Sequence, residues 1–332
     1  MIKSSNTTEK LSIAEAKTLK GIGLSSKEAL ELITETNSSI FSLLALTDKI
    51  RVAFKGTEIN LCSIVNAKSG LCAEDCTFCG QSSKYDTSGE AYPMVASGEI
   101  VGAAKEAEKI GAREFSIVTS GTKVGAEKEL ETLSKAIGEI NSSSGLESCA
   151  SLGNVSKNTL SELKEAGLHS YHHNLETSRS FFPEICTTHD YEDDIDTIKN
   201  AKALGMYACS GGIFGLGESW DDRAELAMTL KDLDVDCVPI NFLDPRPGTP
   251  LEDAKHLSPK DCLKIIALFR LILPKKDIIV CGGREVNLRD QQALIFSAGA
   301  NGMMIGNYLT TKGRASEDDL QMLEDLGLTP RK

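Results

Sequence analysis

Three cysteines on one short segment are the residues of this chain whose types and spacing could do chemistry together. Cys72, Cys76 and Cys79 lie in the run GLCAEDCTFCGQSSKY and are spaced C-x3-C-x2-C. Thiols at this spacing can reach three corners of a cubic iron–sulfur cluster, which leaves the fourth iron without a protein ligand. A cluster held by four cysteines mainly transfers electrons, whereas an open iron can bind a small molecule and direct chemistry onto it. The spacing therefore predicts a [4Fe-4S] cluster with one open coordination position.

Zinc binding and disulfide formation are the alternative uses of these thiols. Zinc sites more often combine two C-x2-C pairs or mix Cys with His. No second pair lies near this segment, and four of the five histidines lie between residues 169 and 189. The ten cysteines could indicate a secreted disulfide protein, but the N-terminal run MIKSSNTTEKLSIAEAK has no apolar signal-peptide core. We therefore expect a cytoplasmic protein, in which thiols stay reduced and bind metals or do chemistry.

The charge of the chain bears on its partners. The formal net charge is −12, whereas nucleic-acid phosphates and anionic membrane surfaces require clusters of Lys and Arg. No run approaches about 18 uninterrupted apolar residues, the minimum for a membrane-spanning helix. We expect neither a nucleic acid nor a membrane as partner.

Short apolar segments alternate with amphipathic helical segments along most of the chain. This alternation indicates βαβ units and a parallel sheet, and eight units over about 260 residues suit a (β/α)8 TIM-type barrel of the α/β class. Residues 1–57 are expected to form an N-terminal helical extension, residues 58–332 the barrel, and residues 316–328 a final helix. The expected strands are 59–65, 114–119, 147–152, 170–175, 206–214, 236–242, 277–281 and 302–305, and the expected helices lie near 97–110, 126–140, 156–166, 191–204, 219–232, 258–272 and 287–298.

The position of the three-cysteine segment agrees with such a barrel. Functional groups of these barrels gather at the C-terminal ends of the strands. The segment follows the first expected strand, so it should lie at the mouth of the barrel.

Several motifs together resemble those of the radical S-adenosylmethionine (SAM) enzymes. An aromatic residue, Phe78, precedes the last cysteine of the motif, and GGIFGLGE at 211–218 resembles the Gly-x-Ile-x-Gly-x-x-Glu element of these enzymes. More narrowly, AKSGLCAEDCTFCGQSSKY, YHHNLETS, CSGGIFGLGES, VPINFLDPRPGTPL and GGRE resemble the biotin synthase family. The resemblance implies that SAM is cleaved to a 5′-deoxyadenosyl radical and that sulfur from an auxiliary iron–sulfur cluster is inserted into dethiobiotin.

The resemblance also implies roles for single residues. Asn174 and Glu176 correspond to residues that contact the SAM ribose, because a carboxylate can accept hydrogen bonds from the ribose hydroxyls. Asn174 is also expected to lie near the substrate. Asn241 corresponds to a residue that bonds the ureido ring of dethiobiotin, and Thr310 and Thr311 to hydroxyls that hold its carboxylate. A solvent-facing strand end and an ordinary loop are the alternative interpretations. The implied SAM-binding residues are Phe78, Asn174, Glu176, Gly211, Ile213, Gly215 and Glu218, and the implied catalytic residues are Cys72, Cys76, Cys79 and Arg284.

The auxiliary cluster is where this sequence departs from the family pattern. The familiar form holds a [2Fe-2S] cluster with one Cys from each of strands 2, 3 and 5 and an Arg from strand 7. Cys149, Cys209 and Arg284 match, but the strand-2 position is Ser116, a poor iron ligand because its hydroxyl must lose a proton.

Additional cysteines on other strands suggest a rearranged auxiliary cluster. We expect a four-iron cluster, with the [4Fe-5S] form as one candidate, in preference to [2Fe-2S]. The alternative for each cysteine is an ordinary small buried side chain, which is our interpretation of Cys186 and Cys262. The expected ligands are Cys62, Cys149, Cys209 and Cys237, with Cys281 in reserve, and Arg284 would then only hydrogen-bond cluster sulfides.

A second departure is Asp194. The family often has Arg at this position, where it pairs with the SAM carboxylate, and an acid would repel that group. Either His189 or another base substitutes, or the local register has shifted.

Two other classes of protein stay open at this point. Another radical SAM barrel enzyme, of the hydrogenase-cofactor maturase or methylornithine synthase type, would share the barrel and the three-cysteine segment. A non-catalytic iron–sulfur protein would have no use for the SAM-like glycine element. For the favoured interpretation we expect dethiobiotin, an external electron donor of the flavodoxin or ferredoxin type, and a homodimer.

Overall fold

The strands of the protein close into a parallel barrel. The computed structural model describes residues 2–124, 126–309 and 313–332. Each neighbouring pair of barrel strands is parallel, and the last strand returns to pair with the first, so that Asn60 lies opposite Gly302. The barrel predicted from the sequence is confirmed. Its strands are β1 (Glu58–Lys68), β2 (Glu114–Thr119), β3 (Glu147–Ser151), β4 (Ser170–His172), β5 (Tyr207–Cys209), β6 (Gly212–Phe214), β7 (Cys237–Phe242), β8 (Asp277–Val280) and β9 (Gly302–Met304).

One barrel strand is interrupted where a glycine lies close to its neighbour. Cys209 of β5 pairs with Cys237 of β7, and Gly212 of β6 pairs with Ile240 at the same offset. β5 and β6 therefore act as one of eight barrel positions. A Cβ on Gly211 would lie 1.9 Å from the carbonyl oxygen of Pro239, so only glycine fits at this break.

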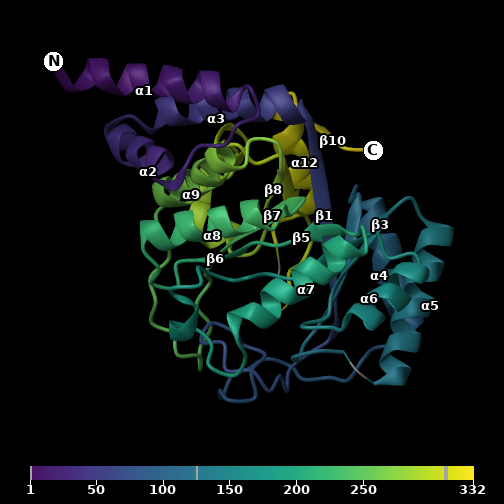
Figure 1. The fold of residues 1–332 in the computed structure, drawn as a ribbon. Helices are drawn as coiled ribbons and strands as arrows, with labels where there is room; N and C mark the ends of the chain where they lie inside the picture. Colours follow the sequence, from purple (N-terminus) through teal and green to yellow (C-terminus); the bar gives the residue numbers. More distant parts are fainter. Residues whose placement is uncertain (1, 125, 310–312) are drawn as a thin grey trace.

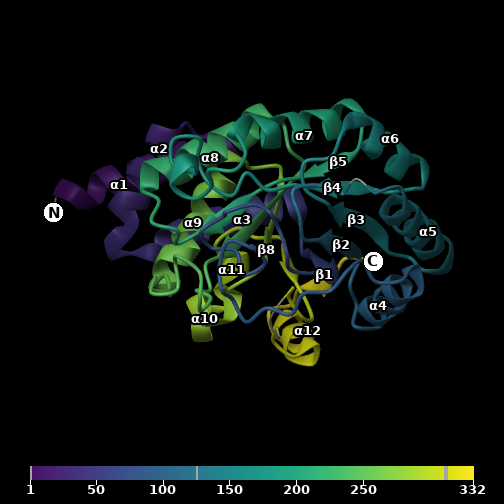
Figure 2. The ribbon, with the colours of Figure 1, turned by 90° about the horizontal axis from the view of Figure 1, so that it is seen from below.

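The helices surround the strands on the outside, and Figure 2 shows α4 to α9 following one another around the barrel. Their inward faces are apolar: α5 buries Leu133, Ala136 and Ile137. The helix expected near 287–298 is replaced by two short helices, α10 and α11. The helices are α4 (Ser97–Lys109), α5 (Glu127–Ser143), α6 (Lys157–Glu165), α7 (Tyr191–Ala203), α8 (Trp220–Asp232), α9 (Pro259–Ile272), α10 (Arg284–Leu288) and α11 (Leu294–Ser297), with short 3-10 turns η1 (Thr36–Ser38), η2 (Phe182–Glu184) and η3 (Arg289–Gln291).

In the described part of the chain, three α-helices precede the first strand: α1 (Ile2–Thr18), α2 (Ser26–Glu35) and α3 (Ile40–Lys55). α2 packs on α8 and α9, and α3 packs on α9 and α11. The Thr47 hydroxyl donates to the Ser297 carbonyl at 2.8 Å, and Arg51 Nε donates to the Phe296 carbonyl at 3.1 Å. These bonds fix α3 on the barrel wall, while the division of the chain after residue 57 stays a prediction.

The C-terminal segment returns to the start of the barrel. α12 (Ser316–Asp325) is followed by β10 (Thr329–Pro330), which pairs with Glu58 and Ile59 at the beginning of β1. In Figure 1 the N-terminal helices and β10 lie at one end of the molecule, and the segment that follows β1 lies at the other. Within the described ranges, no helix combines the length and the apolar character needed to cross a membrane.

Candidate active site at the barrel mouth

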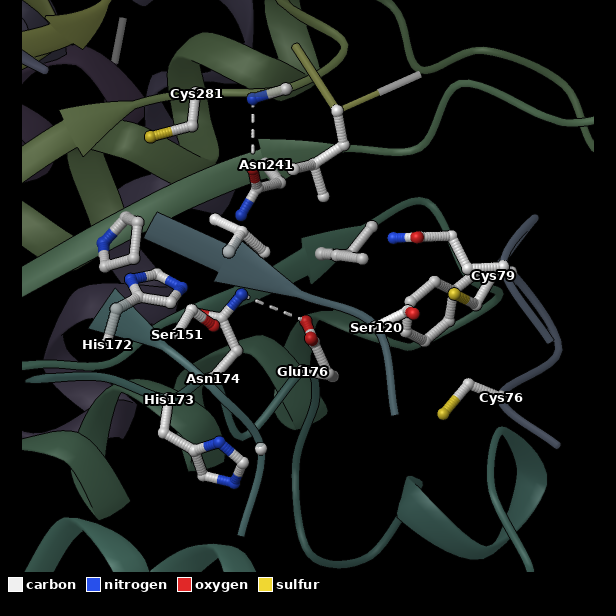
Figure 3. A pocket seen from close by; sticks show the side chains of 18 of the residues that line it. Cys76, Cys79, Ser120, Ser151, His172, His173, Asn174, Glu176, Asn241 and Cys281 are labelled. Carbon is white, nitrogen blue, oxygen red and sulfur yellow. Dashed lines mark hydrogen bonds between the residues drawn. The ribbon is translucent and has the colours of Figure 1, made fainter. Parts of the chain in front are cut away.

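A cavity of about 470 Å³ runs from the segment after β1 into the barrel interior. Cys76 and Cys79 lie at one end of it, and His172 and Cys281 lie at the other (Figure 3). Polar side chains from the ends of β4 and β7 lie between these two ends. One cavity therefore joins the two groups of thiols.

The three-cysteine segment folds back on itself at the mouth. The Cys72 amide donates to the Gln81 carbonyl at 3.0 Å, and the Cys72 carbonyl accepts from the Ser83 amide at 2.7 Å. The Thr77 amide donates to the Ile185 carbonyl at 2.9 Å, which ties the segment to the chain after β4. These backbone bonds hold three thiols on one wall.

The donor set of this segment fits the predicted [4Fe-4S] cluster. Cys72, Cys76 and Cys79 are free, partly exposed thiols, and all three line the cavity with Phe78. Burial raises the pKa of Cys79, and contact with the Cys186 thiol together with burial raises the pKa of Cys76. A metal cluster is the partner that would stabilise the thiolate forms of these residues.

Asn174 and Glu176 lie between the two ends of the cavity, directly after β4. Asn174 Nδ2 donates to Glu176 Oε2 at 3.3 Å, and Asn174 Oδ1 accepts from the Gly211 amide at 3.1 Å. Burial raises the pKa of Glu176 to about 8. Glu176 also has a φ of 62°, a conformation that side-chain-bearing residues rarely adopt and that is common at functional sites. This pair can exchange hydrogen bonds with a polyol such as a ribose.

Asn241 lines the opposite wall and is fixed by neighbouring strands. Its Oδ1 accepts from the Gly282 amide at 2.9 Å, and its Nδ2 donates to the Gly212 carbonyl at 3.3 Å. Ile213 lines the cavity beside it. Thr310 and Thr311, predicted to hold the substrate carboxylate, lie outside the described residues.

The interior cysteines gather at the inner end of the cavity. Cys62, Cys149, Cys209 and Cys281 line it, whereas Cys237 does not. Cys237 is fully buried behind Cys209, its cross-strand partner, and packs with Cys281. Ser116, cross-strand partner of Cys149, also lines the cavity. Cys281, predicted as the reserve candidate, therefore lines the cavity, whereas Cys237 packs against the thiols that line it.

Two further polar residues at this inner end were missed by the sequence reasoning. His172 Nδ1 lies 3.3 Å from Cys209 Sγ, and burial lowers the pKa of His172 to about 4, which leaves a neutral ring. Its signal was available, because His172 precedes Asn174 by two residues and shares its face. Glu114 lines the cavity with a pKa raised by burial, and nothing in the sequence singled it out.

Part of the predicted SAM-binding element supports the cavity wall from behind it. Gly211, Gly215 and Glu218 do not line the cavity. The Glu218 carboxylate accepts from the Gly215 and Leu216 amides at 3.0 and 2.8 Å and from Arg223 Nε at 2.8 Å. Glu218 therefore holds the turn after β6.

Arg284 is placed differently from the prediction. β8 ends at Val280, Gly283 adopts a left-handed conformation, and Arg284 begins α10. Its guanidinium forms a buried pair with Asp319 of α12 at 2.7 Å (Nη2–Oδ2) and 3.1 Å (Nη1–Oδ1). Arg284 does not line the cavity, and its buried Nε has no partner among the described residues, so its role toward a cluster stays a prediction.

Asp194 is buried in a network of histidines. Its Oδ1 lies 2.8 Å from His173 Nε2 and accepts from Asn154 Nδ2 at 3.0 Å, and its Oδ2 lies 3.4 Å from His189 Nε2. Burial would raise the pKa of Asp194, but the two histidines outweigh it and lower the pKa to about 2. Asp194 thus lies at the cavity as an acid with histidine partners.

Cys186 belongs to the same wall, although the sequence suggested a purely structural role. Its Sγ lies 3.9 Å from Cys76 Sγ and 3.3 Å from His189 Nδ1. Contact with Cys76 and His189 lowers the pKa of Cys186 to about 4. Cys262, by contrast, is buried on α9.

Comparison with known proteins decides the family. The Radical SAM superfamily profile matches residues 68–230, and the Biotin and Thiamin Synthesis associated domain matches residues 239–329. The biotin synthase of Geotalea uraniireducens is 51% identical over 98% of this chain and 98% of that protein. The biotin synthase of Geobacter metallireducens is 51% identical over 93% and 94%. This chain belongs to the biotin synthase family.

Solved structures share the barrel at lower identity. A methylornithine synthase aligns with a TM-score of 0.83 and 20% identity over 96% of this chain and 97% of that one. A maturase of the [FeFe]-hydrogenase aligns with a TM-score of 0.83 and 16% identity over 98% and 76%. These likenesses extend to the fold alone. The 51% identity with biotin synthases over nearly the whole chain therefore favours that family over the two other radical SAM families and over a non-catalytic iron–sulfur protein.

Proposed function

We propose that this protein converts dethiobiotin to biotin by SAM-dependent radical sulfur insertion. Membership of the biotin synthase family supports the reaction. The observation that carries it in this chain is the single cavity with thiols at both ends and with Asn174, Glu176 and Asn241 between them (Figure 3). A radical formed at the mouth and a sulfur held at the inner end could then act on one substrate.

The residues at the mouth hold and orient SAM in this proposal. Cys72, Cys76 and Cys79 would hold a [4Fe-4S] cluster, which would supply the electron for the cleavage of SAM. Asn174 and Glu176 exchange hydrogen bonds with the ribose hydroxyls, and Phe78 lines the same cavity. The barrel wall excludes water, which protects a primary-carbon radical.

The residues at the inner end hold the sulfur donor. We assign Cys62, Cys149 and Cys209 as ligands of the auxiliary cluster, with Cys281 preferred over Cys237 as the fourth because it lines the cavity. Four thiolates can hold either a [2Fe-2S] or a four-iron cluster. We propose the four-iron form because Ser116 replaces the strand-2 cysteine of the familiar [2Fe-2S] site. Asn241 faces the ureido group of dethiobiotin, whose carbonyl and two N–H groups an amide can satisfy.

The reaction requires an external source of electrons. The electron comes from an external flavodoxin-type or ferredoxin-type donor, and we propose a cytoplasmic homodimer. Ten free thiols suit a reducing compartment.

The test is anaerobic incubation of the reconstituted protein with dethiobiotin, SAM and a low-potential reductant. Biotin and 5′-deoxyadenosine should both form, and protein loaded with ³⁴S-sulfide should transfer that isotope to biotin. Deoxyadenosine formed at an equal rate without dethiobiotin, together with no biotin, would refute the proposal.

A further inference from the structure

Glu74 in the three-cysteine segment, together with Cys186 and His189 in the segment after β4, has the composition of a metal site. Glu74, Cys186 and His189 each offer one ligand atom, and these atoms lie within 4.8 Å of one another. His189 Nδ1 lies 2.8 Å from Glu74 Oε2 and 3.3 Å from Cys186 Sγ. Thiolate, imidazole and carboxylate are the three ligand types that zinc accepts.

The separations are close to those around a bound ion. In tetrahedral zinc with ordinary bond lengths, nitrogen and oxygen ligands lie about 3.4 Å apart and nitrogen and sulfur about 3.6 Å apart. The observed Nδ1–Oε2 separation is shorter by about 0.6 Å and the observed Nδ1–Sγ separation by about 0.3 Å. Small side-chain rotations would therefore open the site enough to admit an ion.

The groups behind these side chains have the arrangement that orients metal ligands. Asp194 is 2% exposed, and its Oδ2 lies 3.4 Å from Nε2 of His189, the ring nitrogen on the far side from Glu74 and Cys186. A carboxylate that accepts the second N–H of a ligating histidine is the usual outer partner of zinc. The Thr122 and Thr188 hydroxyls each bond one oxygen of Glu74.

We propose that Glu74, Cys186 and His189 bind one divalent cation of the zinc class, with Asp194 as the outer partner that orients His189. Three protein ligands leave a fourth position, as in zinc sites that bind a small molecule. All three side chains line the cavity, so this position is accessible to water or to a ligand carboxylate. The ion would place positive charge on the cavity wall where this chain has Asp194 and the family often has arginine.

The site is separate from the cluster ligands but close to them. Cys186 Sγ lies 3.9 Å from Cys76 Sγ, close to the separation of about 3.8 Å between two thiolates on one zinc. In cluster-free protein Cys76 could therefore become a fourth ligand. The decisive measurement is made on cluster-loaded protein, in which Cys76 is already bound to iron.

The experiment loads purified, cluster-reconstituted protein anaerobically with Zn²⁺, removes loose metal by gel filtration, and measures zinc and iron by mass spectrometry. About one zinc per chain should remain, and zinc-edge X-ray absorption should show about one sulfur ligand with nitrogen and oxygen. Cys186→Ser and His189→Gln should lose the zinc and keep the iron. Cys262→Ser, which removes a buried thiol on α9, is the matched control and should retain both metals.

A further variant examines the outer partner. Asp194→Asn should weaken zinc binding by about 10- to 100-fold in competition with a chelating dye, since outer-shell partners have effects of that size. Circular dichroism and iron content identify any variant that fails to fold.

Several results would overturn the site: no zinc in the wild-type protein, equal zinc in all variants, zinc retained only without the cluster, or joint loss of iron and zinc in both Cys186→Ser and His189→Gln. Zinc content is read without turnover. A failure to make biotin therefore counts against the proposed function and not against this site.

Discussion

The buried pair between Arg284 and Asp319 gives a prediction that separates a structural role from a cluster-ligand role. Arg284→Met removes two N–H donors from Asp319, which is 0% exposed. Among the described residues, Arg314 Nη1 at 3.3 Å is the side-chain donor that Asp319 keeps. Removing one partner of a buried pair costs about 3–5 kcal/mol, and the remaining Arg314 contact favours the lower end, about 3 kcal/mol. With a urea slope of about 3 kcal/mol/M, the unfolding midpoint should fall by about 1 M.

The double variant Arg284→Met with Asp319→Leu is the matched control. It removes both charges, so most of the lost stability should return. The assay is anaerobic urea unfolding of cluster-loaded protein, followed by fluorescence, with iron measured on the same samples. Both variants should keep the full iron content. A double variant that regains stability but loses the auxiliary iron would show that Arg284 is a ligand and that the reasoning from its ion pair is wrong.

Three further predictions concern the interior and the base of the barrel. Cys209→Ser should lose the auxiliary iron, keep about four irons per chain and still cleave SAM. Cys262→Ser should have the iron content and SAM cleavage of the wild-type protein. Iron analysis and deoxyadenosine assays check both variants. The pKa of Asp277 is lowered below its usual range because its interactions with Lys55 and its other partners outweigh burial. The stabilisation from Asp277 is therefore present above about pH 4 and is lost as the pH falls through the folded pKa. Asp277→Asn should flatten that part of the pH–stability curve, measured by urea unfolding. Gly211→Ala should destabilise the fold by more than about 2 kcal/mol because of the approach to Pro239, measured by the same unfolding assay, and a wild-type midpoint would contradict it.

The order of the elements could be predicted from the sequence because it depends on local periodicity. The strand 114–119 matches β2 residue for residue, and the helix expected near 97–110 differs from α4 by one residue. The segment expected at 206–214 was right in position, although it divides into β5 and β6. The helix expected at 287–298 was wrong in detail, because the chain turns after α10 and forms only short helices there.

The inner end of the cavity could be predicted only in part. The alternation of side chains along the strand predicted that Cys237 faces the barrel interior, as Asn241 does. In the structure Cys237 packs with the interior residues Cys209 and Cys281. Barrel closure then set Cys237 behind Cys209, while Cys281, just after β8, came to line the cavity. Depth within a barrel depends on strand tilt and register, which residue alternation does not give.

The sequence by itself determined the barrel, the three thiols on one segment and their position at the mouth, because all of these follow from spacing within single segments. The tertiary structure alone decided that Cys186 lies beside Cys76 from 110 residues away, that Asp194 is buried among histidines, and that Arg284 turns toward α12. These contacts join side chains from different elements. Their partners are fixed by how the strands close and where the loops cross, and no local pattern specifies that.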